Sequence, residues 1–287
     1  MKGKIGIFGM AILIILASCT KEYSLENGGN NGDGLIVGAD CRISNIVSHD
    51  SATLIALSSI AARINARDTV TNITQFDSLG NNLLFSSSPV YFADTIFIDA
   101  DEYFLQDLTS GRIVRLHGLY DPTDLSSEFD ADYIYDASGY LVQKVYTLAM
   151  FPGFPVLEVD YFYSGGNLVH SMSTDLTISA IIGDADVDYY SNITPKNYMN
   201  IMPDEGNNLD FNRYAQFTQF FNFGKKPLNA VKKMTVRDYL GGDSTVTDFK
   251  TYIMSRDNYV LSVYMNGDDQ PSIPAEAGRL YFSYHCK

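Results

Sequence analysis

The sequence predicts an all-β domain: an antiparallel β-meander of repeated hairpins, folded into a curved sheet or a sandwich, with one or two short helices. Three observations lead to this fold class. Segments rich in β-branched and aromatic residues alternate polar with apolar positions, as antiparallel strands with one wet face do. Clusters of Gly, Asn, Asp and Ser separate these segments and supply turn chemistry. The turns recur about every 30 residues, the size of one hairpin unit.

The N-terminal segment has the composition of an export signal. Lys2 and Lys4 precede an apolar run, Ile5 to Leu16, which is too short for the roughly 20 residues that a membrane-spanning helix needs. Its Leu-Ala-Ser-Cys ending resembles the bacterial lipobox, which implies cleavage before Cys19 and a lipid on the Cys19 thiol. An ordinary secretory signal with an incidental cysteine is the alternative. We expect a lipid-anchored protein of the outer membrane, on its periplasmic or its surface-exposed face.

Three regions follow from this interpretation. Residues 1–18 form the lipoprotein signal peptide, and residues 19–34 form a flexible tether, because Gly, Asn and acidic residues with few apolar ones cannot bury a core. Residues 35–287 form a β-rich extracytoplasmic domain, long enough for one large core or two small ones.

The net charge of −14 limits the classes of molecule that the protein is expected to bind. A strongly acidic surface repels nucleic acid and gives no charge-driven grip on anionic lipid. The expected membrane contact is therefore the lipid anchor alone. The acidity favours divalent cations or basic partners, although solubility explains it equally well.

Two cysteines follow Cys19, near the two ends of the domain. Cys41 and Cys286 are an even pair in an exported chain, which predicts a disulfide. It would clasp the first and last strands and stabilise the fold by about 5 kcal/mol at most. Two buried free thiols are the alternative.

Strand and turn signals run through the whole domain. Asp94–Ile98, Gly139–Tyr146 and Glu158–Tyr163 have strand composition. The turns between strands carry residues that tolerate positive φ, namely Gly80, Gly111, Gly139, Gly166 and Asn258.

One of these hairpins has a known likeness. Tyr133 to Leu141 reads Tyr-x-Tyr-Asp-x-x-Gly-x-Leu and resembles the YD-type repeats of bacterial surface proteins. Asn222 to Lys233, with the strands after it, is similar to uncharacterised Bacteroidota surface lipoproteins that contain a domain of unknown function. The resemblance implies an extended antiparallel meander and brings no catalytic residues with it.

Two segments have helical periodicity. Tyr214, Phe217 and Phe221 lie at i, i+3 and i+7 in an insert between about Ile178 and Phe223, which predicts a short helix over 212–221 that packs on the sheet. Residues 51–66 repeat apolar positions in a similar way. They fit either a short helix or a long strand.

Candidate chemistry is sparse. Nucleophile-elbow, zinc-protease and phosphate-loop motifs are missing, and the histidines have no metal-ligand spacing. Asp184, Asp186 and Asp188 are the best metal candidate: on a strand they share one face, where Ca²⁺ could bridge them. The alternative is an edge strand with its acids in water and Ala185, Val187 and Tyr189 inward. We otherwise expect no cofactor.

The chain has 20 tyrosines and no tryptophan. Exposed tyrosines anchor ligands, whereas tyrosines in the strand alternation fill the core. We expect a non-catalytic lipoprotein that binds a glycan, a peptide or an envelope partner. The alternatives are a hydrolase with a non-standard carboxylate site and a passive envelope spacer.

Overall fold

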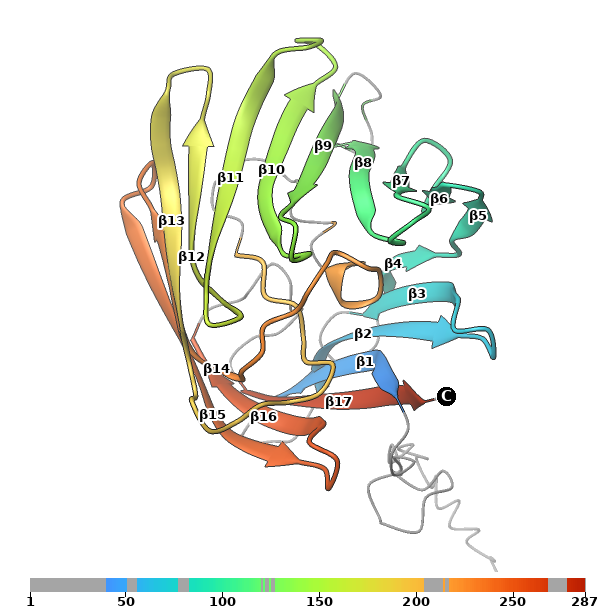
Figure 1. Cartoon of the computed structure of the whole chain (residues 1–287), viewed down its shortest axis with the longest axis vertical. Coiled ribbons are helices and arrows are strands. Elements are labelled where there is room, and N and C mark those ends of the chain that lie inside the picture. The colour runs from blue at the N-terminus through green and yellow to red at the C-terminus, as the bar shows by residue number, and fades with distance from the viewer. Residues whose placement is uncertain are drawn as a thin grey trace, which may run out of the picture.

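The computed structural model describes residues 40–50, 56–76, 83–119, 121, 124, 127–203, 214, 217–267 and 278–286. The export signal, Cys19 and the expected tether lie outside these ranges. Within them, seventeen strands form one antiparallel sheet (Figure 1). In chain order the strands are β1 (Cys41–His49), β2 (Ala56–Ile64), β3 (Val70–Phe76), β4 (Leu83–Ser87), β5 (Val90–Phe92), β6 (Thr95–Phe97), β7 (Tyr103–Gln106), β8 (Ile113–Leu119), β9 (Glu128–Tyr135), β10 (Leu141–Leu148), β11 (Pro155–Ser164), β12 (Asn167–Asp175), β13 (Ala180–Tyr189), β14 (Val231–Asp238), β15 (Asp243–Met254), β16 (Val260–Asn266) and β17 (Gly278–Cys286).

The sheet curves until its first and last strands meet. β1 pairs with β2 on one side and with β17 on the other. Pairing in register continues from β2 to β4, and from β5 to β17. Ser88 and Pro89 connect β4 to β5. The result is a curved wall around a filled interior (Figure 1). The predicted antiparallel meander is confirmed, in its curved-sheet form.

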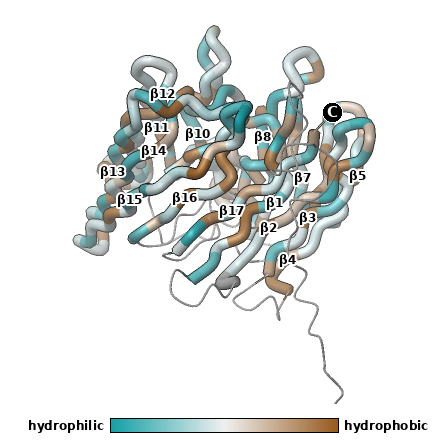
Figure 2. Tube along the Cα trace, turned by 90° about the horizontal axis from the view of Figure 1, so that it is seen from below, coloured by the Kyte–Doolittle hydropathy of each residue, from teal (hydrophilic) through white to brown (hydrophobic). Residues whose placement is uncertain are grey.

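The strands alternate inward and outward residues, as the sequence predicts. On β9, Phe129 and Ala131 are buried, whereas Asp130 and Asp132 are partly exposed on the outer face. Coloured by hydropathy, the strands change between hydrophobic and hydrophilic residues along their length (Figure 2). This alternation places the apolar core inside the wall.

The insert between β13 and β14 fills the interior. Its described residues, 190–203, 214 and 217–230, bury large side chains within the wall: Tyr198, Met199, Ile201, Met202, Tyr214, Phe217, Phe220 and Phe223. Phe104 of β7 meets Phe217 and Phe223 at ring-centroid distances of 5.7 Å each. The insert therefore supplies much of the hydrophobic core.

The helix predicted over 212–221 is wrong in its described part. Those residues contain 3-10 conformation alone, at 214 and at 217–219. Tertiary contacts take the place of a longer helix: the Phe220 carbonyl accepts from Arg42 Nη2 at 3.0 Å, and the Gln219 side chain bonds both backbone groups of Asn200. The apolar stripe nevertheless packs in the core, as expected. The other ambiguous segment, 51–66, is strand β2 from Ala56 onward, and residues 51–55 lie outside the described ranges.

The hairpin turns at one end of the sheet hold left-handed residues. Positive φ angles occur at Asp68, Gly111, Gly139, Gly166 and Asn258, which confirms four of the predicted turn positions; Gly80 lies outside the described residues. Asn258, with φ of 65°, takes the place of glycine.

Residues 222–229, here called the strap, bond to three of these turns. Ile113 N–H, beyond the Gly111 turn, donates to the Asn222 carbonyl at 2.8 Å. Lys225 N–H donates to the Gly139 carbonyl at 2.9 Å, and Leu228 N–H donates to the Gly166 carbonyl at 3.1 Å. Successive turns of this kind are two strands, or about 9.6 Å, apart. Three extended residues span about 10 Å, so a bond every third residue matches the repeat of the hairpins.

A disulfide closes the same end of the sheet. Cys41 and Cys286 are bonded, with a Cα–Cα distance of 4.0 Å and a sequence separation of 245 residues. The two residues are direct partners in the β1–β17 ladder. Cys41 N–H also donates to the buried Tyr259 hydroxyl at 3.0 Å. The predicted clasp between the first and last strands is confirmed.

Candidate functional site

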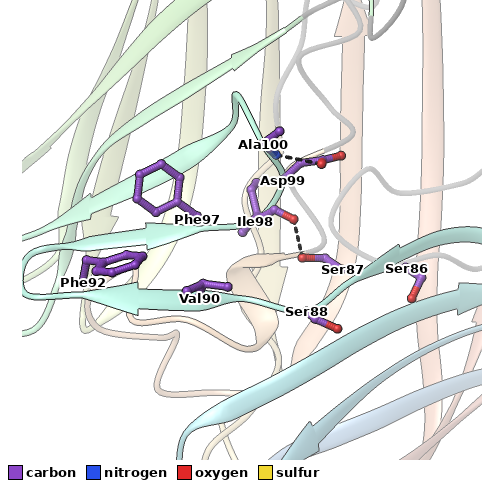
Figure 3. A pocket seen from close by; sticks show the side chains of 9 residues that line it. All are labelled: Ser86, Ser87, Ser88, Val90, Phe92, Phe97, Ile98, Asp99 and Ala100. Carbon is purple, nitrogen blue, oxygen red and sulfur yellow. Dashed lines mark hydrogen bonds between the residues drawn. The ribbon is translucent and has the colours of Figure 1, made fainter.

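A cavity of about 460 Å³ opens where the sheet changes pairing partners, between β4 and β6. Ser86, Ser87, Ser88, Val90, Phe92, Phe97, Ile98, Asp99 and Ala100 line it (Figure 3). Ser87 Oγ donates to the Ile98 carbonyl at 2.6 Å and ties the two sides together at one point. We call this cavity the groove.

The local sequence explains the change of partner. β4 pairs with β3, and after Ser88 and Pro89 the chain pairs with β6 instead. Proline has no N–H to extend a ladder, so the pairing with β3 stops there. Asn72 Nδ2 holds the departing chain by donating to the Ser87 carbonyl at 3.0 Å.

A tyrosine secures the far side of the bend. The Tyr91 hydroxyl donates to the Val70 carbonyl at the start of β3, at 2.9 Å. Burial raises the pKa of Tyr91 to about 12, against the smaller opposing effect of Arg42. Tyr91 therefore stays a neutral hydrogen-bond donor across the physiological range.

Aromatic side chains continue from the groove across the outer face. The Phe92 and Phe97 rings lie 5.8 Å apart, Phe97 and Tyr103 5.5 Å, and Tyr103 and His117 4.9 Å. Phe97, Tyr103 and His117 are direct cross-strand partners on β6, β7 and β8. We call these four residues the aromatic row.

Charged groups end the row. His117 Nδ1 lies 2.9 Å from Asp130 Oδ1 on β9. Next to them, Arg115 bonds both carboxylate oxygens of Asp132, at 2.5 and 2.9 Å. The hydrogen bond to Asp132 and the Asp132 charge raise the pKa of Arg115, against the lowering effect of burial.

The groove carries apolar side chains that are exposed to solvent. Val90 is 50% exposed and Phe92 61%, and Leu84 on the neighbouring β4 is 59% exposed. Exposed apolar side chains that gather next to polar groups mark binding surfaces. Asp99 is the one acidic residue among those that line the groove, and its Oδ1 accepts the Ala100 N–H at 2.7 Å.

The aspartates predicted as a metal candidate lie elsewhere, on β13, and two of them are ion-paired. Arg237 Nε lies 3.0 Å from Asp184 Oδ1, and the Arg237 guanidinium also pairs with Asp186. His170 Nδ1 lies 2.9 Å from Asp186 Oδ1, and the Tyr239 hydroxyl donates to Asp184 at 3.0 Å.

The edge-strand alternative for this segment needs revision. β13 is flanked by β12 and β14, so the expected edge strand is wrong. Ala185 and Val187 do point inward, and the aspartates face outward. Within the described ranges, no group of three His, Cys, Asp or Glu side chains is placed to hold a metal ion. Ca²⁺ binding by Asp184, Asp186 and Asp188 remains a prediction, and it would have to compete with Arg237.

The tyrosines belong mainly to the core. Tyr133, Tyr146, Tyr161 and Tyr198 are among the buried ones, in line with the alternation. The exposed aromatic surface is centred on phenylalanines, which sequence reasoning missed. A local signal was present: three serines and a proline directly before the short apolar run Val90 to Phe92.

The described residues contain no helix long and apolar enough to cross a membrane. No protein-family model matches the chain, and no curated protein matches it in sequence.

Solved structures do resemble it. A porin-like protein from Bacteroides uniformis superposes with a TM-score of 0.55 at 12% identity, over 85% of this chain and 98% of that one. A porin-like protein from Bacteroides vulgatus gives a TM-score of 0.47 at 12% identity, over 86% of this chain and 99% of that one. At this identity the likeness concerns architecture alone: the chain shares its all-β fold with the porin-like protein of Bacteroides uniformis.

Proposed function

We propose that this protein is a lipid-anchored, non-catalytic binding protein of the bacterial outer membrane, and that its groove binds a neutral glycan. One observation carries the proposal: the exposed Phe92 ring and the half-buried Phe97 ring stand beside serine hydroxyls and a carboxylate in one cavity. Aromatic rings pack on the apolar faces of sugar rings, while hydroxyl and carboxylate groups bond sugar hydroxyls.

The residues at the groove favour binding over hydrolysis. Glycoside hydrolysis ordinarily needs two carboxyl groups, about 5–9.5 Å apart, on either side of the bond. Asp99 is the single acidic side chain of the groove lining. A neutral glycan is favoured over an acidic one, because the net charge of −14 repels anions.

The two faces of the wall support a binding role in water. The outer face carries charged side chains, among them Arg115, Asp130, Asp132, Asp184, Asp186, Arg237, Asp248 and Lys250. Charges are costly to transfer into hydrocarbon. The inside is packed with aromatic and aliphatic side chains, which favours a filled shell over a conduit.

The anchor is proposed from Cys19 and the segment before it. Two or more acyl chains give stable membrane attachment. Cells that express the full chain should label it with a palmitate analogue and retain it in the outer-membrane fraction. Cys19→Ala should abolish both. A labelled or membrane-bound Cys19→Ala protein would contradict the anchor.

Affinity electrophoresis tests the groove. The purified Cys19→Ala protein is run through native gels that contain neutral polysaccharides (a xylan, a glucan, a mannan) or an acidic pectin. We expect at least one neutral polysaccharide to retard it, with or without EDTA, since no cofactor is proposed. Phe92→Ala should remove the retardation, and Phe162→Ala, an aromatic on the same outer face at β11, should not. Migration unaffected by every neutral polysaccharide would contradict glycan binding and favour a spacer.

A further inference from the structure

Three neighbouring hairpin tips expose apolar side chains at the end of the sheet opposite the strap. They connect β10 to β11, β12 to β13, and β14 to β15, and the first two stand at the top of Figure 1. Their exposed residues are Met150, Phe151, Phe154, Ile178, Ile181, Tyr239 and Leu240, from 49% to 73% exposed. We call these seven residues the rim.

Local hydrogen bonds hold the tips in shape. Phe151 N–H donates to the Leu148 carbonyl at 2.9 Å, and Phe154 N–H donates to the Phe151 carbonyl at 3.0 Å. Asp175 Oδ1 accepts the Thr177 N–H at 2.8 Å, and Asp238 Oδ1 accepts the Leu240 N–H at 2.8 Å. The rim side chains thus project from ordered turns, and little backbone entropy is lost when a partner covers them.

The charges around the rim have one sign. The stretches 148–157, 175–183 and 238–243 contain no lysine or arginine, and their only charged residues are Asp175, Asp238 and Asp243. Arg237, next to them in sequence, is already paired with Asp184 and Asp186. The aspartates beside the rim would repel an anionic bilayer. They would attract a protein face that is edged with Lys or Arg.

The course of the chain places the rim away from the anchor. Cys41, where the described domain begins after the predicted tether, lies at the strap end: Asn197 Nδ2 donates to Asp40 Oδ1 at 2.9 Å, and Lys196 N–H donates to the carbonyl of the turn residue Asn258 at 2.8 Å. Strands of nine or ten residues, such as β1 and β11, span about 30 Å. With the lipid on Cys19, which is part of the proposed function, the chain from the anchor enters the domain at the strap end, and the rim is the end farther from that point.

We infer that the rim is a docking surface for a second envelope protein that presents an apolar face edged with basic residues. Exposed apolar patches on a stable fold mark such surfaces, and large apolar anchors contribute most of the binding energy. The site is separate from the groove: its occupant is a protein, held at the end of the sheet opposite the point where the chain from the anchor enters.

Site-specific photo-crosslinking in cells tests this in the full, lipidated chain. Benzoylphenylalanine replaces Phe154 at the rim or, as a matched control, Leu108, which is 69% exposed in the β7–β8 turn at the opposite end. We expect one discrete adduct with a different protein from position 154, and none of that mass from position 108. The change Asp243→Lys reverses a charge next to the rim and leaves the turn-capping Asp175 and Asp238 in place. It should remove the adduct while the melting temperature stays within a few degrees.

Every other outcome overturns the proposal. A lipid-sized adduct would make the bilayer the occupant, and an adduct of twice the chain mass would make it a second copy. Three further results would contradict a specific protein partner at the rim. They are the same adduct from both positions, an adduct that survives the charge reversal, and the absence of any adduct. The failures are separable: palmitate labelling reports the anchor and gel retardation reports the groove, and neither depends on the rim.

Discussion

The backbone N–H of Lys225 donates to the carbonyl of Gly139 at 2.9 Å, across 86 residues of sequence, and this bond joins the strap to the hairpin turn between β9 and β10. Gly224, directly before it, has a φ of 88°, and a Cβ there would lie 2.7 Å from the same Gly139 oxygen. The strap therefore sits as close to the turn as a glycine allows.

Gly224→Ala should be strongly destabilising. A left-handed alanine costs about 1–2 kcal/mol, and the contact with Gly139 adds to it, for a total of about 3 kcal/mol or more. Gly153→Ala is the control, because Gly153 also has positive φ (79°) but open space around it. Urea unfolding of both variants measures the difference. Equal losses would show that the strap does not pack against the turn.

The Cys41–Cys286 bridge should contribute to stability through the unfolded chain. The β1–β17 ladder already aligns the two residues, so the main effect is to restrict the unfolded ensemble. Replacing both cysteines by serine should lower the free energy of unfolding by about 2–5 kcal/mol. A reductant should lower the melting temperature of the parent protein and leave the double variant unchanged. A parent protein insensitive to reductant would argue against the bridge.

Stability should rise between pH 8 and pH 10. Burial, with a smaller contribution from Arg42, lowers the pKa of Lys226 from 10.5 to about 8. Below pH 8 both the native and the unfolded state hold the Lys226 proton, and the cost of the partly buried charge is fully present. Above it the native state releases a proton that the unfolded chain keeps, so stability increases with pH. Beyond pH 10 the trend reverses for Tyr91, whose native pKa of about 12 exceeds its unfolded value of 10.0.

Denaturation series at several pH values check this titration. Lys226→Met should raise stability at pH 7 and remove the rise between pH 8 and pH 10. Lys225→Met, its exposed neighbour on the strap, should leave the rise in place. A rise that persists in Lys226→Met would assign it to another group.

Arg237 should matter more than an ordinary surface charge. It serves both Asp184 and Asp186, and the Asp184 side chain is only 14% exposed. Arg237→Ala leaves a partly buried carboxylate without its cation and should cost about 1–3 kcal/mol. Lys250→Ala, which breaks an exposed pair with Asp248, should change the melting temperature much less, because solvent screens exposed pairs. Thermal melts compare the two. A rise in the parent melting temperature with millimolar Ca²⁺ would instead support the metal interpretation of the β13 aspartates.

Local sequence patterns predicted the curved sheet, but not the path of the insert that fills its interior. The polar–apolar alternation of the strands and the turn residues, such as Asn258, are patterns of a few consecutive residues. The cysteine pair follows from counting the cysteines. All three can therefore be recognised in the sequence alone. The path of the insert depends on partners such as Gln219 with Asn200 and Arg42 with Phe220, which no local pattern links. The groove was missed because β5 has three residues, too few for alternation to separate an outward Phe92 from a core phenylalanine. Arg237 lies 51 residues from Asp186 in the sequence. The spacing of the aspartates therefore indicated a metal site, and no local pattern indicated their ion pairs with Arg237.

A single-tryptophan reporter tests glycan binding at the groove most directly, because the chain has no tryptophan of its own. Phe92→Trp places the probe at the groove, and Phe162→Trp places it on the same outer face at β11, where the native ring is 46% exposed. Each protein is titrated with the neutral polysaccharide that retards the parent most. We expect a saturable blue shift and protection from acrylamide for Phe92→Trp, and neither for Phe162→Trp. Unchanged emission from Phe92→Trp in a protein that the polysaccharide still retards would contradict binding at the groove.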